Sequence, residues 1–245
     1  MNTAKTAYLV TGVSQGIGAE LVQQLLAQQA PVFGVSRRLA DFDHPLYLGA
    51  SADLSLSFDA ADLVAQALAF FAQFDLTTLV LINNAGTVAP MALSGHYPEP
   101  PVANAIHLNL TAPILLSNAF IQQLPAQLHG KLLHISSGAA QTPYPGWGVY
   151  GASKAGLDHF SRIVQKEHPE LCSVALYPGV VNTGMQAHIR AQDKADFPNL
   201  DQFIALKDNA ALSEPEHVAR AILAYLVSPA FGREAVVDIR KLADD

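Results

Sequence analysis

Two kinds of hydrophobic segment alternate along this chain. Short continuous apolar runs, such as TAYLV at 6–10 and TLVLIN at 78–83, predict strands that are buried on both faces. Longer stretches repeat apolar residues at helical spacing. The predicted strands are 6–10, 31–36, 46–50, 78–83, 131–136, 172–177 and 235–239.

The predicted helices lie between these strands. They cover residues 16–29, 58–73, 101–128, 150–167 and 214–227. Within 101–128 we expect one or two helices, with Pro113 as the candidate break. Ser213 is the expected N-cap of the last helix.

This alternation predicts an α/β fold, a doubly wound parallel sheet of about seven strands with helices on both faces. Such sheets bind ligands beyond the carboxyl ends of their strands, so the residues after each strand are the candidates for chemistry. No linker or repeat divides the chain, and we expect a single domain over 1–245.

Composition narrows the class of protein. Half of the 245 residues are hydrophobic, 14% are charged and the net charge is −7. Without a Lys/Arg cluster we expect no nucleic-acid partner. No apolar run reaches the roughly 20 residues that span a bilayer, and residues 1–12 do not resemble a signal peptide, so we expect a cytoplasmic protein with no membrane partner. A single cysteine, Cys172, excludes an internal disulfide.

The first candidate site is TGVSQGIG at 11–18, directly after the first strand. Gly12, Gly16 and Gly18 let the backbone turn tightly and approach a pyrophosphate, while the next helix presents its N-terminus to it. The spacing differs from the common G-x-G-x-x-G fingerprint. We interpret the loop as a nucleotide site; a plain tight turn is the alternative.

The second strand ends in Ser36, Arg37 and Arg38. An acidic residue here would bind a ribose 2′-hydroxyl, whereas arginine matches the geometry and charge of a 2′-phosphate. The replacement favours NADP over NAD. The alternative is two solvated surface arginines.

Polar residues also follow the third and fourth strands. Asp53 lies either near an adenine or simply in a loop, and the amides of NNAG at 83–86 can brace neighbouring loops. Asn109 interrupts an apolar helical stretch. It either breaks the helical ladder and holds a water or is a satisfied polar group of the core.

Tyr150 and Lys154 occur in GVYGASKAGL at 148–157. On a helix they lie one above the other on the same face. A nearby cation favours the charged form of a phenol, so the pair can act as an acid near neutral pH. An ordinary exposed helix pair is the alternative. Ser137, at the end of the fifth strand, belongs to no Gly-x-Ser-x-Gly elbow and is interpreted as a hydrogen-bond donor to a substrate carbonyl.

In combination these motifs resemble the short-chain dehydrogenase/reductase family. The matching elements occur in the family's order and spacing over nearly the whole chain, and Ser137 lies thirteen residues before Tyr150, as the family's serine does. The resemblance implies a Rossmann fold, a nicotinamide cofactor, which the arginines after the second strand favour as NADP, and hydride transfer at a carbonyl. The motifs that carry it are TGVSQGIG, NNAG, Asn109, Ser137, Tyr150-x-x-x-Lys154 and PGVVNT at 178–183.

The resemblance also implies roles for individual residues. Tyr150 would protonate the carbonyl oxygen, Ser137 would hold it, and Lys154 would bond the nicotinamide ribose. Asn109 would support a water chain that returns protons through Lys154. No metal is expected. The cofactor-binding residues it implies are Gly12, Ser14, Gln15, Gly16, Ile17, Gly18, Ser36, Arg37, Arg38, Asp53, Leu54, Asn83, Ala85, Gly86, Tyr150, Lys154, Pro178, Gly179, Val181 and Thr183.

Within the family, the chain is similar to the sepiapterin and benzil reductases, which reduce vicinal dicarbonyls with NADPH. The segments that carry this similarity are ISSGAA, PYPGWGVYGASKAGLD, NTGMQAHIR and VVDIRK. We expect a substrate lid at about 182–212 and substrate contacts from Ser137, Trp147, Met185 and Asp238. Asp238 is either an acidic anchor for a pterin ring or a strand-end cap.

Two other functions, one enzymatic and one non-catalytic, remain as alternatives. A 3-oxoacyl-thioester reductase would need a basic entrance, of which Arg190 and Lys194 offer only a little. A non-catalytic redox sensor would usually carry a damaged Tyr-Lys pair. The resemblance further implies a homodimer or homotetramer, formed through helices 101–128 and 150–167, that acts on a small-molecule carbonyl.

Overall fold

A parallel sheet of seven strands organises the chain. The computed structural model describes residues 5–40 and 42–242, so the first four residues of the amino-terminal stretch lie outside the described residues. The strands are β1 (Thr6–Thr11), β2 (Val32–Ser36), β3 (Tyr47–Ser51), β4 (Thr78–Asn83), β5 (His129–Ile135), β6 (Cys172–Tyr177) and β7 (Val236–Asp238). Their spatial order is β3-β2-β1-β4-β5-β6-β7, with every neighbouring pair parallel.

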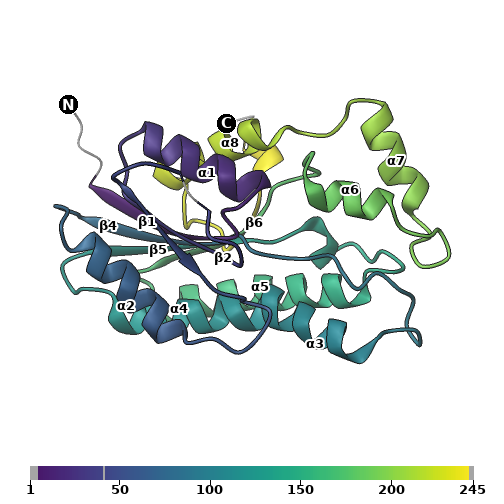
Figure 1. The fold of residues 1–245 in the computed structure, drawn as a ribbon, viewed down its shortest axis with the longest axis horizontal. Coiled ribbons are helices and arrows are strands. Elements are labelled where there is room, and N and C mark those ends of the chain that lie inside the picture. Colours follow the sequence, from purple (N-terminus) through teal and green to yellow (C-terminus); the bar gives the residue numbers. More distant parts are fainter. Residues whose placement is uncertain (1–4, 41, 243–245) are drawn as a thin grey trace.

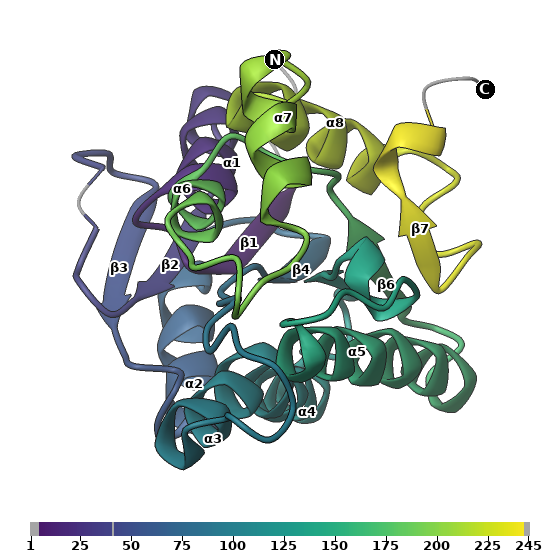
Figure 2. The ribbon, with the colours of Figure 1, turned by 90° about the vertical axis from the view of Figure 1, so that its right-hand side faces the viewer.

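Helices cover both faces of the sheet (Figures 1 and 2). One face carries α1 (Gly16–Ala27) and α8 (Pro215–Val227), and α6 (Gly184–Arg190) and α7 (Leu200–Asp208) lie beyond its edge on the same side. The opposite face carries α2 (Ala60–Phe71), α3 (Glu99–Ile106), α4 (Ala112–Gln123) and α5 (Gly148–Glu167). The doubly wound α/β fold expected from the sequence is therefore confirmed.

The burial of the strands explains their composition. From the second residue to the last, β1, β4 and β6 are buried throughout, since helices exclude water from both of their faces. The edge strand β3 has only one neighbouring strand and keeps no fully buried residue. The sheet order reverses between β1 and β4, and open α/β sheets bind ligands beyond the carboxyl ends of the strands at such a point.

Two local expectations were wrong. Pro113 does not break the chain's helix, because it lies in the first turn of α4, where no backbone N–H is needed. The irregularity is instead one π-helical turn at His107–Thr111, which joins α3 to α4. Ser213 is not the N-cap of α8: Glu214 holds that position, and the backbone of Ser213 pairs with Val180 and Asn182.

The segment expected as a lid folds against the N-terminal end of α5. Phe197 has no exposed surface, and its ring stacks on Trp147 with centroids 4.9 Å apart. Phe203 contacts both rings, at centroid distances of 5.0 and 5.3 Å. Gly146 approaches so closely that a Cβ there would lie 2.3 Å from the carbonyl oxygen of Asp196. These aromatic contacts hold the 182–212 segment against the start of α5.

Replacing Phe197 with Ala should release the lid while the sheet stays folded. The change deletes a fully buried ring from a cluster separate from the two cores that flank the sheet. We expect faster amide hydrogen exchange over 184–208 and early proteolysis there. Leu133→Ala, at a fully buried position in β5, is the control; it should lower the global free energy of unfolding by about 2–5 kcal/mol. Uniformly faster exchange in Phe197→Ala would contradict this prediction.

Candidate active site

Tyr150, Lys154 and Ser137 meet where β5 ends against α5. Tyr150 and Lys154 are 7% and 4% exposed, and the Lys154 ammonium lies 5.9 Å from the centroid of the Tyr150 ring. The Lys154 Nζ atom donates to the carbonyl oxygen of Ile135, at 2.7 Å. Ser137 follows two residues later, and its hydroxyl is a hydrogen-bonding neighbour of Tyr150. The exposed-pair alternative is thus excluded.

Burial governs the proton affinities of this pair. It raises the pKa of Tyr150, and the Ser137 hydroxyl partly opposes the rise. It lowers the pKa of Lys154 to about 8, against a partial rise caused by the nearby carboxylate of Asp158. Lys154 therefore changes charge close to the pH at which an enzyme works, which suits a proton relay.

Asn109 lies in the π-helical turn and is fully buried. Its Oδ1 atom accepts from the backbone N–H of Thr87 at 2.8 Å, and its Nδ2 atom donates to the Thr87 carbonyl at 2.8 Å and to Ser153 Oγ at 3.2 Å. The side chain is therefore a satisfied polar group of the core, and it lies in a turn where the regular helical ladder is interrupted. It ties the segment after β4 to the helix that carries Tyr150.

The glycine loop is held by the NNAG segment. Asn84 donates from Nδ2 to the carbonyls of Thr11 and Gly12, at 2.9 and 3.1 Å. In return, Thr11 Oγ1 accepts from the backbone N–H groups of Asn84 and Ala85. Gly12 has φ +75°, and a Cβ at Gly18 would lie 2.2 Å from the Gly12 carbonyl oxygen. These glycines are required by the backbone itself.

The structure spreads the predicted cofactor residues along the carboxyl edge of the sheet. Several of these side chains are buried, and that of Asn83 points into the core toward Ser117 and His134. Leu54 and Val181 also bury their side chains and offer only backbone to the edge. Ser14 and Gln15 are exposed in the glycine loop; Gly12, Gly16, Ile17, Ala85, Gly86, Pro178, Gly179 and Thr183 are partly buried.

Arg37 and Arg38 extend into solvent beyond β2. Neither guanidinium forms a hydrogen bond or an ion pair with another described residue, whereas the buried Ser36 hydroxyl donates to the Arg38 carbonyl at 2.6 Å. Asp53 Oδ1 accepts from the N–H and the hydroxyl of Ser55, which, with Arg37 as a smaller influence, lowers its pKa. The edge of β2 thus presents two cations that are free to receive an anion.

The segment after β6 closes toward the glycine loop. A Cβ at Gly16 would lie 3.1 Å from Thr183 Cγ2, and one at Gly184 would lie 3.7 Å from Gln15 Oε1. The 178–183 wall and the glycine loop are therefore immediate neighbours, as a single extended ligand spanning both would require.

Two of the four expected substrate residues, Trp147 and Met185, lie at the contact between α5 and the 182–212 segment. Trp147 is buried, with its ring 5.4 Å from that of Tyr150. Met185 packs at the margin of the same aromatic cluster. Asp238 is different, because both of its carboxylate oxygens are engaged: Arg240 Nε donates to Oδ1 at 2.9 Å and Nη2 to Oδ2 at 2.6 Å. Asp238 also caps the last short helix, so its geometry is that of a strand-end cap.

Sequence reasoning missed a buried polar group behind the site. Asp158, Ser136 and Tyr177 form one hydrogen-bonded cluster between α5, β5 and β6. A signal existed, because Asp158 is a charge four residues after Lys154, on the buried side of an amphipathic helix. His134 was also missed; burial and the charge of Lys154 lower its pKa to about 3, so it is neutral.

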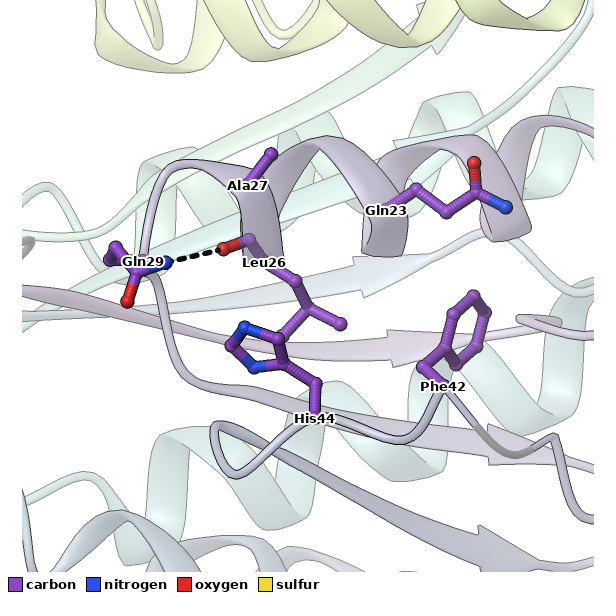
Figure 3. Close-up of a pocket in the computed structure, with 6 residues that line it drawn as sticks. All are labelled: Gln23, Leu26, Ala27, Gln29, Phe42 and His44. Carbon is purple, nitrogen blue, oxygen red and sulfur yellow. Dashed lines mark hydrogen bonds between the residues drawn. The ribbon is translucent and has the colours of Figure 1, made fainter.

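A separate surface hollow lies away from this chemistry (Figure 3). Gln29 lies before β2 and His44 before β3, so the hollow is at the amino ends of the strands, the edge opposite to Tyr150. Its lining residues are Gln23, Leu26, Ala27, Gln29, Phe42 and His44.

Within residues 5–40 and 42–242, no cluster of three or more His, Cys, Asp or Glu is arranged to hold a metal. No helix in those same ranges is long and apolar enough to cross a bilayer.

Comparison with known proteins agrees with this geometry. The model of the short chain dehydrogenase family matches residues 6–194. The chain belongs to this family. It is 36% identical to benzil reductase ((S)-benzoin forming) of Bacillus cereus over 94% of this chain and 98% of that protein. It is 28% identical to sepiapterin reductase of Bos taurus, over 96% and 94%.

Structural comparison gives the same result. A short-chain dehydrogenase/reductase from Saccharomyces cerevisiae superposes with a TM-score of 0.84 at 25% identity, covering 97% of both chains. The expected membership of the short-chain dehydrogenase/reductase family, and the likeness to its benzil and sepiapterin reductases, are confirmed. Members of this family are oxidoreductases that bind a nicotinamide dinucleotide.

Replacing Lys154 with Met should change how stability depends on pH. The pKa of Lys154 is about 8 in the folded protein and ordinarily 10.5, so between these values the unfolded chain binds more protons. The free energy of unfolding of the wild type should therefore rise with pH across this window, relative to Lys154→Met, by at most about 3 kcal/mol. Urea denaturation at pH 8 and pH 10 measures the difference.

Lys166→Met, at an exposed position of the same helix, provides the control. It should leave the pH dependence of the wild type unchanged. If the difference in stability between wild type and Lys154→Met does not vary with pH, the pKa of Lys154 is not lowered by burial and the prediction is wrong.

Proposed function

We propose that this protein is an NADPH-dependent carbonyl reductase whose substrates are vicinal diketones with apolar substituents. The observation that carries the proposal is the meeting of Ser137 with the buried Tyr150 and Lys154 at the end of β5, with the ring of Trp147 directly beside Tyr150. The group supplies protons and the ring supplies an apolar wall.

The residues at the carboxyl edge fit a nicotinamide dinucleotide. Gly12 and Gly16 adopt positive φ angles, and side chains larger than hydrogen at Gly12 or Gly18 would collide with neighbouring backbone. The glycines therefore let the loop fold closely against the start of α1, whose N-terminal N–H groups would bind a pyrophosphate. The neighbouring 178–183 wall would receive the nicotinamide through Pro178, Gly179 and Thr183. A bound reduced nicotinamide would supply hydride to the carbonyl carbon.

The chain's own residues supply the proton. Burial keeps Tyr150 protonated before reaction, so its hydroxyl can donate to a carbonyl oxygen. The Lys154 ammonium stabilises the phenolate that results, and the Ser137 hydroxyl donates a hydrogen bond to the same substrate oxygen. The Asn109 side chain is already engaged with Thr87 and Ser153, so we propose that a relay water toward Lys154 uses the Asn109 main-chain carbonyl.

Two features favour an apolar diketone over a pterin or an acyl thioester. Asp238 is held by Arg240 and is not free to anchor a pterin ring. Arg190 donates to Gln186, and Lys194 pairs with Asp201, so neither forms the open basic entrance that a phosphopantetheine arm would favour. The benzil reductase relative from Bacillus cereus supports the same choice. The complete proton-transfer group argues against a non-catalytic redox sensor.

We further propose how the chain works as a unit. Residues 1–245 would form one NADP-binding domain, with 182–212 as the lid over substrate. Leu115 on α4 and Ile163 on α5 expose 39% and 38% of their surface, which supports a homodimer or homotetramer through these helices. The cytoplasm remains our proposed location.

Turnover of a substrate panel tests the reaction. We expect NADPH oxidation at 340 nm with benzil and an aliphatic 1,2-diketone, and weaker or no oxidation with a pterin diketone or a 3-oxoacyl thioester. Tyr150→Phe should lower kcat by about 10²–10⁴ while NADPH still binds, because only the proton donor is lost. Tyr97→Phe, a phenol on the loop before α3, is the matched control.

Each outcome discriminates between functions. Preferred turnover of the thioester would replace the diketone proposal. Tight NADPH binding without turnover of any panel member would favour the sensor. A Tyr150→Phe variant as active as wild type would refute the proton-transfer role.

Replacing Arg37 with Ala tests the choice of cofactor. Loss of a charged hydrogen bond to a 2′-phosphate should raise the KM for NADPH about tenfold or more and leave the KM for NADH nearly unchanged. Arg220→Ala, which removes a charge on α8, is the control. Equal effects on both cofactors, or a wild type that prefers NADH, would show that Arg37 is only a solvated surface residue.

A further inference from the structure

The cluster behind the active site is centred on Asp158, a residue that the proposed reaction does not use. Asp158 lies on α5, one turn after Lys154, and is 2% exposed. Its Oδ1 atom accepts from Ser136 Oγ at 2.5 Å, and its Oδ2 atom accepts from the hydroxyl of Tyr177. Both donors are themselves buried.

These contacts join the three segments that carry the site. Ser136 directly precedes Ser137, and Tyr177 directly precedes the 178–183 wall. The Ser136 hydroxyl also lies 3.4 Å from the carbonyl oxygen of Lys154, and its backbone N–H donates to Leu176. One carboxylate therefore links α5 to the carboxyl ends of both β5 and β6.

Opposing effects act on the carboxyl group of Asp158. Burial is the largest and raises its pKa above the ordinary value, while the hydroxyls of Ser136 and Tyr177 and the cations Arg162 and Lys154 offset part of that rise. Tyr177 stays protonated, since burial and the adjacent carboxylate raise its pKa. The remaining titratable group near Lys154 on β5 is His134, which is neutral. Because both of its oxygens accept hydrogen bonds, Asp158 is the carboxylate whose charge acts on Lys154 and partly offsets the effect of burial on the pKa of that lysine.

We propose that Asp158 is a positioning residue of the active site: its carboxylate fixes Ser137 and the 178–183 wall against α5, and its charge holds Lys154 in the ammonium form. This inference rests on the proposed reduction, in which Tyr150 and Lys154 must both be protonated. Removing the negative charge lowers the proton affinity of both groups, so the alkaline limit of activity moves to lower pH.

A nearby contact on the same helix shows what a purely structural role would look like. The Ser161 hydroxyl meets Ser173 Oγ at 3.0 Å and the carbonyl of Ala235 at 3.2 Å. It too is buried and links α5 to β6, yet it touches no segment of the site. Ser161→Ala is therefore the matched control for Asp158→Asn.

The first measurement needs neither cofactor nor substrate. In protein labelled with ¹³C at the lysine ε-carbon, NMR titration follows the charge of Lys154, whose signal is identified by its loss in Lys154→Arg. Asp158→Asn should lower the titration midpoint by about one pH unit or more, and Ser161→Ala should leave it unchanged. An unchanged midpoint in Asp158→Asn would overturn the charge role.

The second measurement is the pH profile of benzil reduction with NADPH. Asp158→Asn should lower kcat more than tenfold and shift the alkaline limb by the same amount as the NMR midpoint. A loss of thermal stability with the wild-type profile, as expected for Ser161→Ala, would overturn the proposal. Wild type that does not reduce benzil would refute the proposed function alone, since the NMR titration stands without turnover.

Tyr177→Phe keeps the proposal testable if Asp158→Asn does not fold. It removes one donor but retains the charge, so kcat should fall several-fold while the alkaline limb stays in place. A kcat equal to that of Ser161→Ala would overturn the holding role of the carboxylate.

Discussion

The active site depends on the register between helix α5 and the carboxyl end of β5. Three consecutive residues of the strand end each meet a different side chain of the helix. The pairs are Ile135 with Lys154, Ser136 with Asp158, and Ser137 with Tyr150. A helix displaced by one residue would rotate all three side chains by about 100° and lose every pair together. The spacing of these residues along α5 is therefore a structural requirement before it is a chemical one.

The register between α5 and β5 places the charged side chains of Lys154 and Asp158 where water is excluded, and removing a charge from water costs free energy. Lys154 is nearly fully buried, and a buried ammonium persists only with hydrogen bonds and an opposite charge. The Ile135 carbonyl supplies the former and Asp158 the latter. The same exclusion of water makes each interaction stronger than it would be at the surface. The burial of Lys154 therefore has two effects. It costs folding free energy, and it brings the pKa of this lysine to about 8, where it can exchange a proton near neutral pH.

Most of the fold followed from the sequence, because buried parallel strands and amphipathic helices have different hydrophobic periods. The glycine loop and the Tyr150–Lys154 pair were also predictable, since each is a short stretch whose geometry is set locally. The π-helical turn at Asn109 was foreseen only as an interruption, because its partners, Thr87 and Ser153, are distant in sequence. Asp158 was missed for the same reason, since its donors come from β5 and β6.

The two sides of the site differ in how they are built. The expected cofactor side consists of backbone turns that follow successive strands, so it leaves motifs in the sequence. The expected substrate side depends on tertiary contacts of the 182–212 segment, where Phe197 and Phe203 pack on Trp147. Such packing needs only apolar rings of suitable size and has no fixed spacing. A local pair such as Arg240 with Asp238 can engage both oxygens of a carboxylate without altering the fold. Specificity can therefore diverge among family members while the proton-transfer group stays fixed by its register.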